Sequence, residues 1–242
     1  MKLVVDTRNG LAGDIMAAGL IGLGADPGKV TGAMESAGSG LGGAQVRHNF
    51  LDGVNRLEIL AADKPDHLHA VQARKFLEMA IEEAGICNPW LDMARNALEA
   101  LVRAEGHVHG NHPELKKHFH GHEPVLHEAS DIIMDIAGMA AGMMALDIRG
   151  VEYIGIVNVG GGSVTFSHGT LDVPTPATRQ ILDSRGIPWA RSDSGMEMAT
   201  PTGAAILAGC GATRIVSEPA AIRTALAGGT RPLPPIKFIL AD

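Results

Sequence analysis

The sequence predicts an α/β fold, with a mixed α+β arrangement as the alternative, in which a compact sheet is flanked by helices. Apolar runs typical of strands occur near both ends of the chain, and apolar residues recur at helical spacing in the middle. The chain also opens on a strand, a glycine-rich turn and a helix, as many α/β domains do. Its 242 residues suffice for one large domain, and we expect residues 1–242 to form a single region.

The first elements follow from apolar patterns and turn residues. We expect a strand at residues 3–5 and a helix at residues 15–23, separated by a turn that glycines punctuate. Residues 45–50 and 56–61 are predicted to pair as a hairpin, because Asp52-Gly53 between them supplies the positive φ angles of a tight turn.

The middle of the chain is predicted to be helical, with one long loop. Apolar residues recur at helical spacing over residues 70–84 and 88–105, and a glycine, which commonly ends a helix, follows each run. Residues 106–124 lack a hydrophobic period and contain two prolines, which predicts a mobile, histidine-rich loop. A third helix is expected over about residues 125–146.

The last part of the chain alternates turn signals with short elements. Residues 153–159 form a β-branched run that ends at three glycines, and they are predicted to be a strand. Residues 236–240 are predicted to be the final strand, which a proline-rich stretch precedes.

Composition and charge exclude several classes of function. The net charge is −7 with acidic and basic residues interspersed, which argues against nucleic acid or an anionic membrane as the main partner. The two cysteines, Cys87 and Cys210, lie far apart, so we expect a reducing, cytoplasmic setting and no disulfide framework. A membrane-spanning helix needs about 20 consecutive apolar residues, and no stretch of the chain approaches that length. We also expect no targeting signal.

Histidines are concentrated in one segment, where seven of the eleven lie between positions 107 and 127. Neutral imidazole binds nickel, zinc, copper and iron, and H-x-H spacing places two rings on one side of an extended chain. This spacing occurs twice, in His107/His109 and in His118/His120/His122. The alternative is a solvated loop that binds metal only opportunistically.

A polar stripe follows this segment on the predicted third helix. His127, Asp131 and Asp135 are spaced i, i+4, i+8 and therefore share one face, with Glu128 beside them. The same stripe continues in glycines that leave space for a neighbouring backbone or a ligand. The alternative is a solvent-exposed face whose carboxylates lie near the positive end of the helix.

Two turns are candidate anion or cation sites. The turn at residues 6–14 brings Asp6 and Asp14 near a helix start, where backbone N–H groups can hold a phosphate and a carboxylate can hold a hydrated cation. It is not a Walker A loop, and a structural turn with Asp14 as helix cap is an equal alternative. Thr200 and Thr202 stand at another helix start, where they cap the helix or contact an anion.

Five motifs in this order resemble those of the LarC family of nickel-insertion proteins. They are residues 6–14 (D-x-x-x-G-x-x-G-D), 104–110 (A-E-x-x-V-H-G), 127–138 (H-E, then D-x-I-x-D-I-x-G), 168–178 (similar to H-G-x-x-P-V-P-A-P-A-T) and 200–205 (T-P-T-G-A-A). Thr175 stands where the fourth motif usually has alanine. The match covers most of the chain.

The resemblance implies a cytoplasmic enzyme that inserts nickel between two sulfurs and a carbon of a pyridinium bisthiocarboxylate mononucleotide. The reaction is CTP-dependent in the family and completes the nickel-pincer cofactor of lactate racemase. The family's C-terminal region, associated with metal and CTP binding, is expected to be absent here. Whether a separate C-terminal partner chain supplies this region is left open, and the resemblance does not support CTP as co-substrate of this chain alone.

Taken together, the motifs and the resemblance assign candidate residues to three roles. The catalytic candidates are His168, His127 and Asp131. The candidates for binding the nucleotide-like substrate are Asp6, Gly10, Gly13, Asp14, Thr200, Thr202 and Gly203. The metal-ligand candidates are His107, His109, His118, His120, His122, His127, Glu128, Asp131 and Asp135.

Two other functions compete with nickel insertion. One is a non-enzymatic nickel or zinc chaperone or store, in which the loop histidines bind metal and nothing is transformed. The other is a metal-dependent phosphohydrolase that uses Asp6, Asp14 and the helix carboxylates. The sequence leaves open whether the metal is nickel or another divalent ion such as Mn or Mg, and whether the chain is a homo-oligomer.

Overall fold

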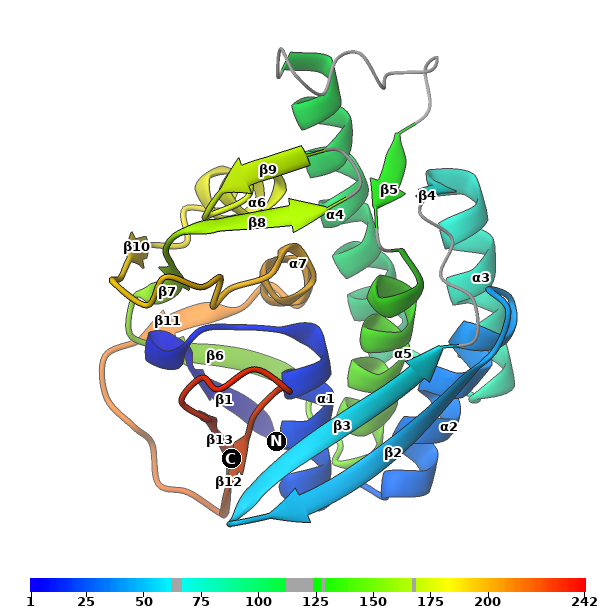
Figure 1. Cartoon of the computed structure of the whole chain (residues 1–242). Coiled ribbons are helices and arrows are strands. Elements are labelled where there is room, and N and C mark those ends of the chain that lie inside the picture. Colours follow the sequence, from blue (N-terminus) through cyan, green and yellow to red (C-terminus); the bar gives the residue numbers. More distant parts are fainter. Residues whose placement is uncertain (62–66, 112–123, 128, 167–168) are drawn as a thin grey trace.

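The computed structural model is built around a mixed sheet with helices packed against it (Figure 1). It describes residues 1–61, 67–111, 124–127, 129–166 and 169–242. The seven strands lie in the order β11 (Thr213–Ile215), β6 (Gly150–Ile154), β1 (Lys2–Asp6), β13 (Ile236–Ala241), β12 (Arg223–Ala227), β3 (Val54–Ala61) and β2 (Ala44–Leu51). The prediction of an α/β fold is confirmed.

Strand β1 lies near the centre of the sheet. It pairs in parallel with β6 and antiparallel with β13, so the first and last strands of the chain are neighbours. Leu3, Val4 and Val5 are completely buried, as expected for a strand that is covered on both faces. Because this burial holds β1 in place, it also positions the C-terminal end of the strand, where the turn at residues 6–14 begins.

The predicted hairpin is confirmed as β2 and β3. The two strands pair along their whole length, from Ala44 opposite Ala61 to Leu51 opposite Val54. Both turn residues have positive φ, 53° at Asp52 and 77° at Gly53, and this conformation matches the right-handed twist of the strands.

Seven helices form the rest of the described core: α1 (Gly13–Gly22), α2 (Pro27–Ser39), α3 (Ala70–Glu83), α4 (Trp90–Asn111), α5 (Ala129–Ala145), α6 (Pro176–Ser184) and α7 (Pro201–Gly209). Helices α1 and α2 pack against the sheet, and α5 packs against α1 and α2 on the side away from it (Figure 1). The stripe glycines of α5 allow this approach, since a Cβ at Gly138 would lie 2.5 Å from Met34 Cγ. No helix in the described part of the chain is long and apolar enough to cross a membrane.

Short strands complete the fold. β4 (His67–His69) pairs with β5 (Val125–His127), β7 (Val157–Gly160) with β10 (Trp189–Arg191), and β8 (Ser163–Phe166) with β9 (Gly169–Asp172). The strand predicted at residues 153–159 is divided between β6 and β7, because Gly155 has a φ of 94° and breaks the run.

Two predicted boundaries around the histidines are wrong. Helix α4 does not end at Gly106 but continues to Asn111, and the burial of Val108 and His109 outweighs the weak helix propensity of glycine. The third helix begins at Ala129 and not at residue 125, because β5 pairs with β4 instead. The rest of the predicted loop lies outside the described residues, so its mobility stays a prediction.

Candidate functional site

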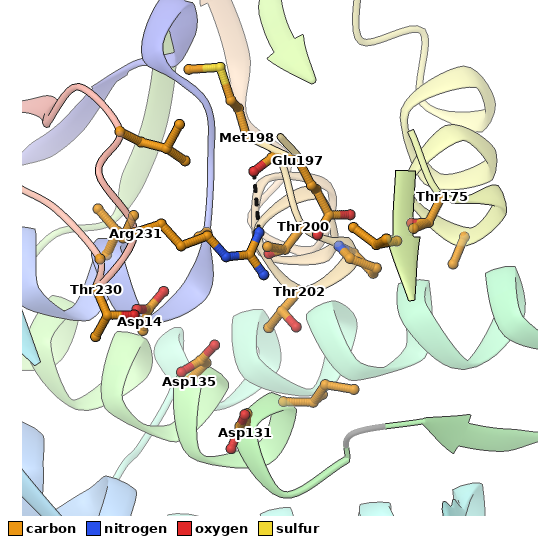
Figure 2. Close-up of a pocket in the computed structure, with 18 of the residues that line it drawn as sticks. Asp14, Asp131, Asp135, Thr175, Glu197, Met198, Thr200, Thr202, Thr230 and Arg231 are labelled. Carbon is orange, nitrogen blue, oxygen red and sulfur yellow. Dashed lines mark hydrogen bonds between the residues drawn. The ribbon is translucent and has the colours of Figure 1, made fainter. Parts of the chain in front are cut away.

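A cavity of about 480 Å³ lies where four helices begin (Figure 2). The first residues of α1, α5, α6 and α7 line it, together with the end of α4 and the loop before β13. A volume of this size is typical of small-molecule sites. The positive ends of four helix dipoles therefore converge on one cavity.

Carboxyl groups are the most frequent charged groups that line this cavity. There are five, which belong to Asp14, Glu105, Asp131, Asp135 and Glu197. Asp135 and Glu197 are only 6% and 8% exposed. Among the described lining residues, Arg231 is the one basic side chain. The cavity therefore favours a cation strongly, and one part of it, at Arg231, favours an anion.

The two aspartates of α5 face this cavity together. Asp131 and Asp135 are one helical turn apart and both line it (Figure 2). Asp135 packs against the start of α1, since a Cβ on Gly13 would lie 2.4 Å from its Oδ2. The alternative of a solvent-exposed stripe is therefore wrong, and the assignment of both aspartates as metal ligands stays a prediction.

Asp14 enters the cavity from the first turn of α1. Burial raises its pKa, the backbone N–H of Ile15 opposes that rise, and the neighbouring charge of Asp131 adds to it. The net pKa lies above the usual value of an aspartate. Asp14 and Asp131 therefore share a region in which a bound cation would relieve their repulsion.

Glu105 lines the cavity from α4, and burial raises its pKa from 4.5 to about 7. The native protein thus holds this proton up to about pH 7, whereas the unfolded chain releases it near pH 4.5. The contribution of Glu105 to the stability of the fold is therefore largest below about pH 4.5, falls as the pH rises from there to about 7, and stays low above that.

Replacing Glu105 with glutamine removes this titration. We expect the free energy of unfolding of the variant, measured by urea denaturation from pH 5 to 8, to fall less with pH than that of the wild type. Over this pH range, the free energy of unfolding should fall by at most about 3 kcal/mol more in the wild type than in the variant. Parallel curves for the two proteins would contradict the raised pKa of Glu105.

The opposite side of the cavity carries hydroxyl groups and Arg231. The Arg231 side chain reaches across the cavity, and its Nη1 donates to the backbone carbonyl of Glu197 at 3.5 Å (Figure 2). Thr200 caps α7, where its Oγ1 accepts a hydrogen bond from the Gly203 backbone N–H at 3.2 Å. Thr202 is 7% exposed, and its hydroxyl has no hydrogen-bonding partner among the described residues. Thr202 and Arg231 are thus available to an anionic group.

Two of the three glycines predicted to contact the nucleotide, Gly10 and Gly203, allow two backbone segments to meet. Gly10 has a φ of 103°, and a Cβ there would lie 2.2 Å from the Met198 carbonyl oxygen. A Cβ on Gly203 would lie 2.6 Å from the Leu11 carbonyl oxygen. Like Gly13, neither is among the described lining residues. These glycines hold the turn at residues 6–14 against the start of α7.

Asp6 lies outside the cavity, contrary to its assignment to nucleotide binding. Its carboxylate accepts hydrogen bonds from Arg8, with 2.6 Å between Arg8 Nη2 and Asp6 Oδ2. Partial burial favours a higher pKa, but the hydrogen bonds and charge of Arg8 outweigh burial and lower it. Asp6 therefore pairs with Arg8 at the end of β1. The phosphohydrolase hypothesis used Asp6 as one of its carboxylates, and this carboxylate does not line the cavity.

None of the described histidines is among the residues that line this cavity. His107 and His109 lie on α4, where two residues correspond to a rotation of about 200°, so their rings do not share a side. His109 is buried and His107 is exposed. The H-x-H interpretation is therefore wrong for this pair.

The remaining candidates lie largely outside the described residues. His127 belongs by its backbone to β5, opposite His67, and not to the helix that carries the aspartates. The other undescribed candidates are His118, His120, His122, Glu128 and His168. Within the described part, no group of three or more His, Cys, Asp or Glu residues is arranged to hold a metal ion.

The sequence-based assignment did not include Glu105, Glu197 or Arg231. Glu105 carried a signal, since it is a charged residue inside the second motif. Glu197 and Arg231 lie in irregular segments whose neighbours show no motif, and only the fold brings them to the cavity.

Comparison with known proteins gives consistent matches. A family model described as "Nickel insertion protein" matches residues 3–240. A "Putative nickel insertion protein" of Methanothermobacter thermautotrophicus is 35% identical over 86% of this chain and 49% of its own length. A "Pyridinium-3,5-bisthiocarboxylic acid mononucleotide nickel insertion protein" of Nocardioides sp. is 32% identical over 85% of this chain and 49% of its own length.

The Thermotoga sp. relative, which has the same name as the Nocardioides protein, is 31% identical over 85% of this chain and 52% of its own length. The chain thus spans about half the length of the curated relatives it matches. No solved structure shows a significant match. The family model nevertheless covers nearly all of the sequence, and the chain belongs to the nickel insertion protein family.

Proposed function

We propose that this chain brings nickel and a pyridinium bisthiocarboxylate mononucleotide together in the acidic cavity, as part of an enzyme that inserts the metal. One observation carries the proposal: a cavity at four helix starts is lined by five carboxyl groups and by Arg231. It offers one environment for a divalent cation and another for a phosphate. The names of the Nocardioides and Thermotoga relatives supply the identity of the substrate.

Nickel is a substrate in this reaction, so the carboxylates of the cavity need not form a complete metal site before nickel binds. Asp131 and Asp135 offer oxygen donors, but the described residues form no preformed set of three ligands. The thiocarboxylate sulfurs of the mononucleotide would complete the coordination, and sulfur binds Ni²⁺ more readily than carboxylate oxygen does. A site that binds nickel loosely can transfer it to the substrate, whereas a storage site must retain it.

Formation of the nickel–carbon bond releases the proton of the pyridinium C–H group, which needs an acceptor. Glu105 lines the same cavity and offers a carboxylate for this step. His127 and His168 stay predictions for this role, as do CTP use, a C-terminal partner chain and a cytoplasmic location.

We expect the phosphate of the mononucleotide to bind at Arg231 and Thr202. Arg231 can bind a phosphate with two parallel hydrogen bonds, and the start of α7 adds its dipole. Arg231 also lies close enough to Asp14 to lower the pKa of that carboxyl group, so it connects the two halves of the cavity.

Arg231→Gln is expected to weaken binding of the mononucleotide by about tenfold, because a charge-assisted pair is lost. Isothermal titration calorimetry checks this, with the nucleoside that lacks the phosphate as a second ligand. The nucleoside should bind wild type and variant equally. Arg191→Gln, an exposed arginine away from the cavity, is the matched control. Equal mononucleotide affinity in Arg231→Gln and wild type would rule out this phosphate position.

A further inference from the structure

A second cavity, of about 410 Å³, lies between α4 and the C-terminal half of α6. Helix α4 contributes residues at i, i+3, i+4 and i+7, which form one face: Ala100, Arg103, Ala104 and His107. Helix α6 and the residue after it contribute Gln180, Ile181, Ser184 and Arg185. No carboxylate is among the described lining residues. In a protein of net charge −7, this cavity therefore has the opposite charge from the acidic cavity.

Two acidic residues next in sequence to lining residues of this cavity, Glu99 and Asp183, are engaged by other partners. Glu99 accepts hydrogen bonds from Arg74, at 2.5 Å from Nε and 3.1 Å from Nη2. Asp183 accepts one from Trp189 Nε1 at 2.8 Å. Within the described part of the chain, neither Arg103 nor Arg185 is within ion-pair distance of a carboxylate, although the charge of Arg103 is near enough to help lower the pKa of Glu99. Both guanidinium groups thus keep their hydrogen-bond donors for a ligand.

We propose that this second cavity binds a phosphate group, either inorganic phosphate or the phosphate of a nucleotide. A guanidinium presents parallel donors that match two phosphate oxygens, and both Arg103 and Arg185 line this cavity. The Gln180 amide adds a neutral donor, and the small side chains Ala100 and Ala104 leave space above α4. Arg185 caps the C-terminus of α6, where its positive charge stabilises the helix dipole, so this arginine has a structural role. Arg103 lies within α4, and the helix dipole gives no such reason for a positive charge there.

The inference is independent of the proposed function, because the two cavities share no lining residue. Helix α6 begins at the acidic cavity with Pro176 and Ala177 and ends at this one. His107 lines this second cavity, on a different face of α4 from Glu105.

Calorimetric titration at low salt with inorganic phosphate, AMP, ATP and adenosine tests the proposal. Wild type should bind the three phosphate-bearing ligands and not adenosine. Equal affinities for phosphate and AMP would show that the phosphate alone is recognised, and tighter AMP binding would identify a nucleotide as the occupant. The double variant Arg103→Gln/Arg185→Gln should weaken binding by about tenfold or more.

The control is Arg47→Gln/Arg191→Gln, which removes the same charge from exposed positions elsewhere and should bind within about twofold of wild type. Three results would overturn the proposal. They are no binding of any phosphate at about 10 mM, equal weakening in both double variants, or loss of binding in Arg231→Gln with binding kept in Arg103→Gln/Arg185→Gln.

Discussion

Replacing Asp131 and Asp135 together by asparagine is expected to lower the rate of nickel insertion by at least about 100-fold. The substitution keeps the volume of both side chains and removes two negative charges from the cavity lining. Because Asp135 is 6% exposed, its charge would act on a bound cation with little solvent screening. The nickel concentration needed for half-maximal rate should rise as well.

Insertion by this variant is followed by mass spectrometry of the nickelated nucleotide, in the reaction mixture in which the wild type is active. Asp92→Asn/Asp193→Asn is the matched control, since both residues are exposed and neither lines the cavity. Thermal unfolding of each variant shows whether the fold is retained. A rate within threefold of wild type in folded Asp131→Asn/Asp135→Asn would exclude the two aspartates from nickel handling.

Gly209→Ala is expected to destabilise the protein by about 3 kcal/mol, because it forces α7 and α4 apart. A Cβ on Gly209 would lie 2.2 Å from the backbone nitrogen of Ala97 and 2.4 Å from its Cα. These are backbone atoms inside a long helix, and they cannot move aside as a flexible side chain can. The melting temperature should fall by on the order of 10 °C, as measured by differential scanning calorimetry.

Gly32→Ala is the control for this clash. Gly32 lies inside α2, and a Cβ there meets nothing within 4 Å. Alanine at this position is expected to stabilise the protein by about 0.5–1 kcal/mol, because it favours the helix and restricts the unfolded chain. If both variants melted at the same temperature, close packing of α7 on α4 would not be what requires glycine at position 209.

The fold could be predicted from sequence where the signal was local. The buried strand at residues 3–5 and the Asp52-Gly53 hairpin depend on neighbouring residues, and both are present. Helix α2 and strand β12 were not predicted, because α2 is rich in glycine and small polar residues and β12 has few β-branched residues. Tertiary packing decides elements of this kind.

The acidic part of the site could be predicted in part for the same reason. Asp131 and Asp135 are linked by helical spacing, so their common face follows from the sequence. Glu197 and Arg231 reach the cavity from loops distant in sequence, and no periodicity indicates their position. The spacing of His107 and His109 was interpreted for an extended chain, whereas the helix that contains them places the rings differently.

The most direct test of nickel insertion is product formation from nickel and the pyridinium bisthiocarboxylate mononucleotide. The chain is incubated with both and with CTP, alone and together with the part of the Methanothermobacter relative that lies outside the match. We predict that mass spectrometry detects the nickelated mononucleotide in at least one of these mixtures, and that it is lost when Asp131 and Asp135 are replaced. Absence of the product from both mixtures with the wild-type chain would contradict the proposed function.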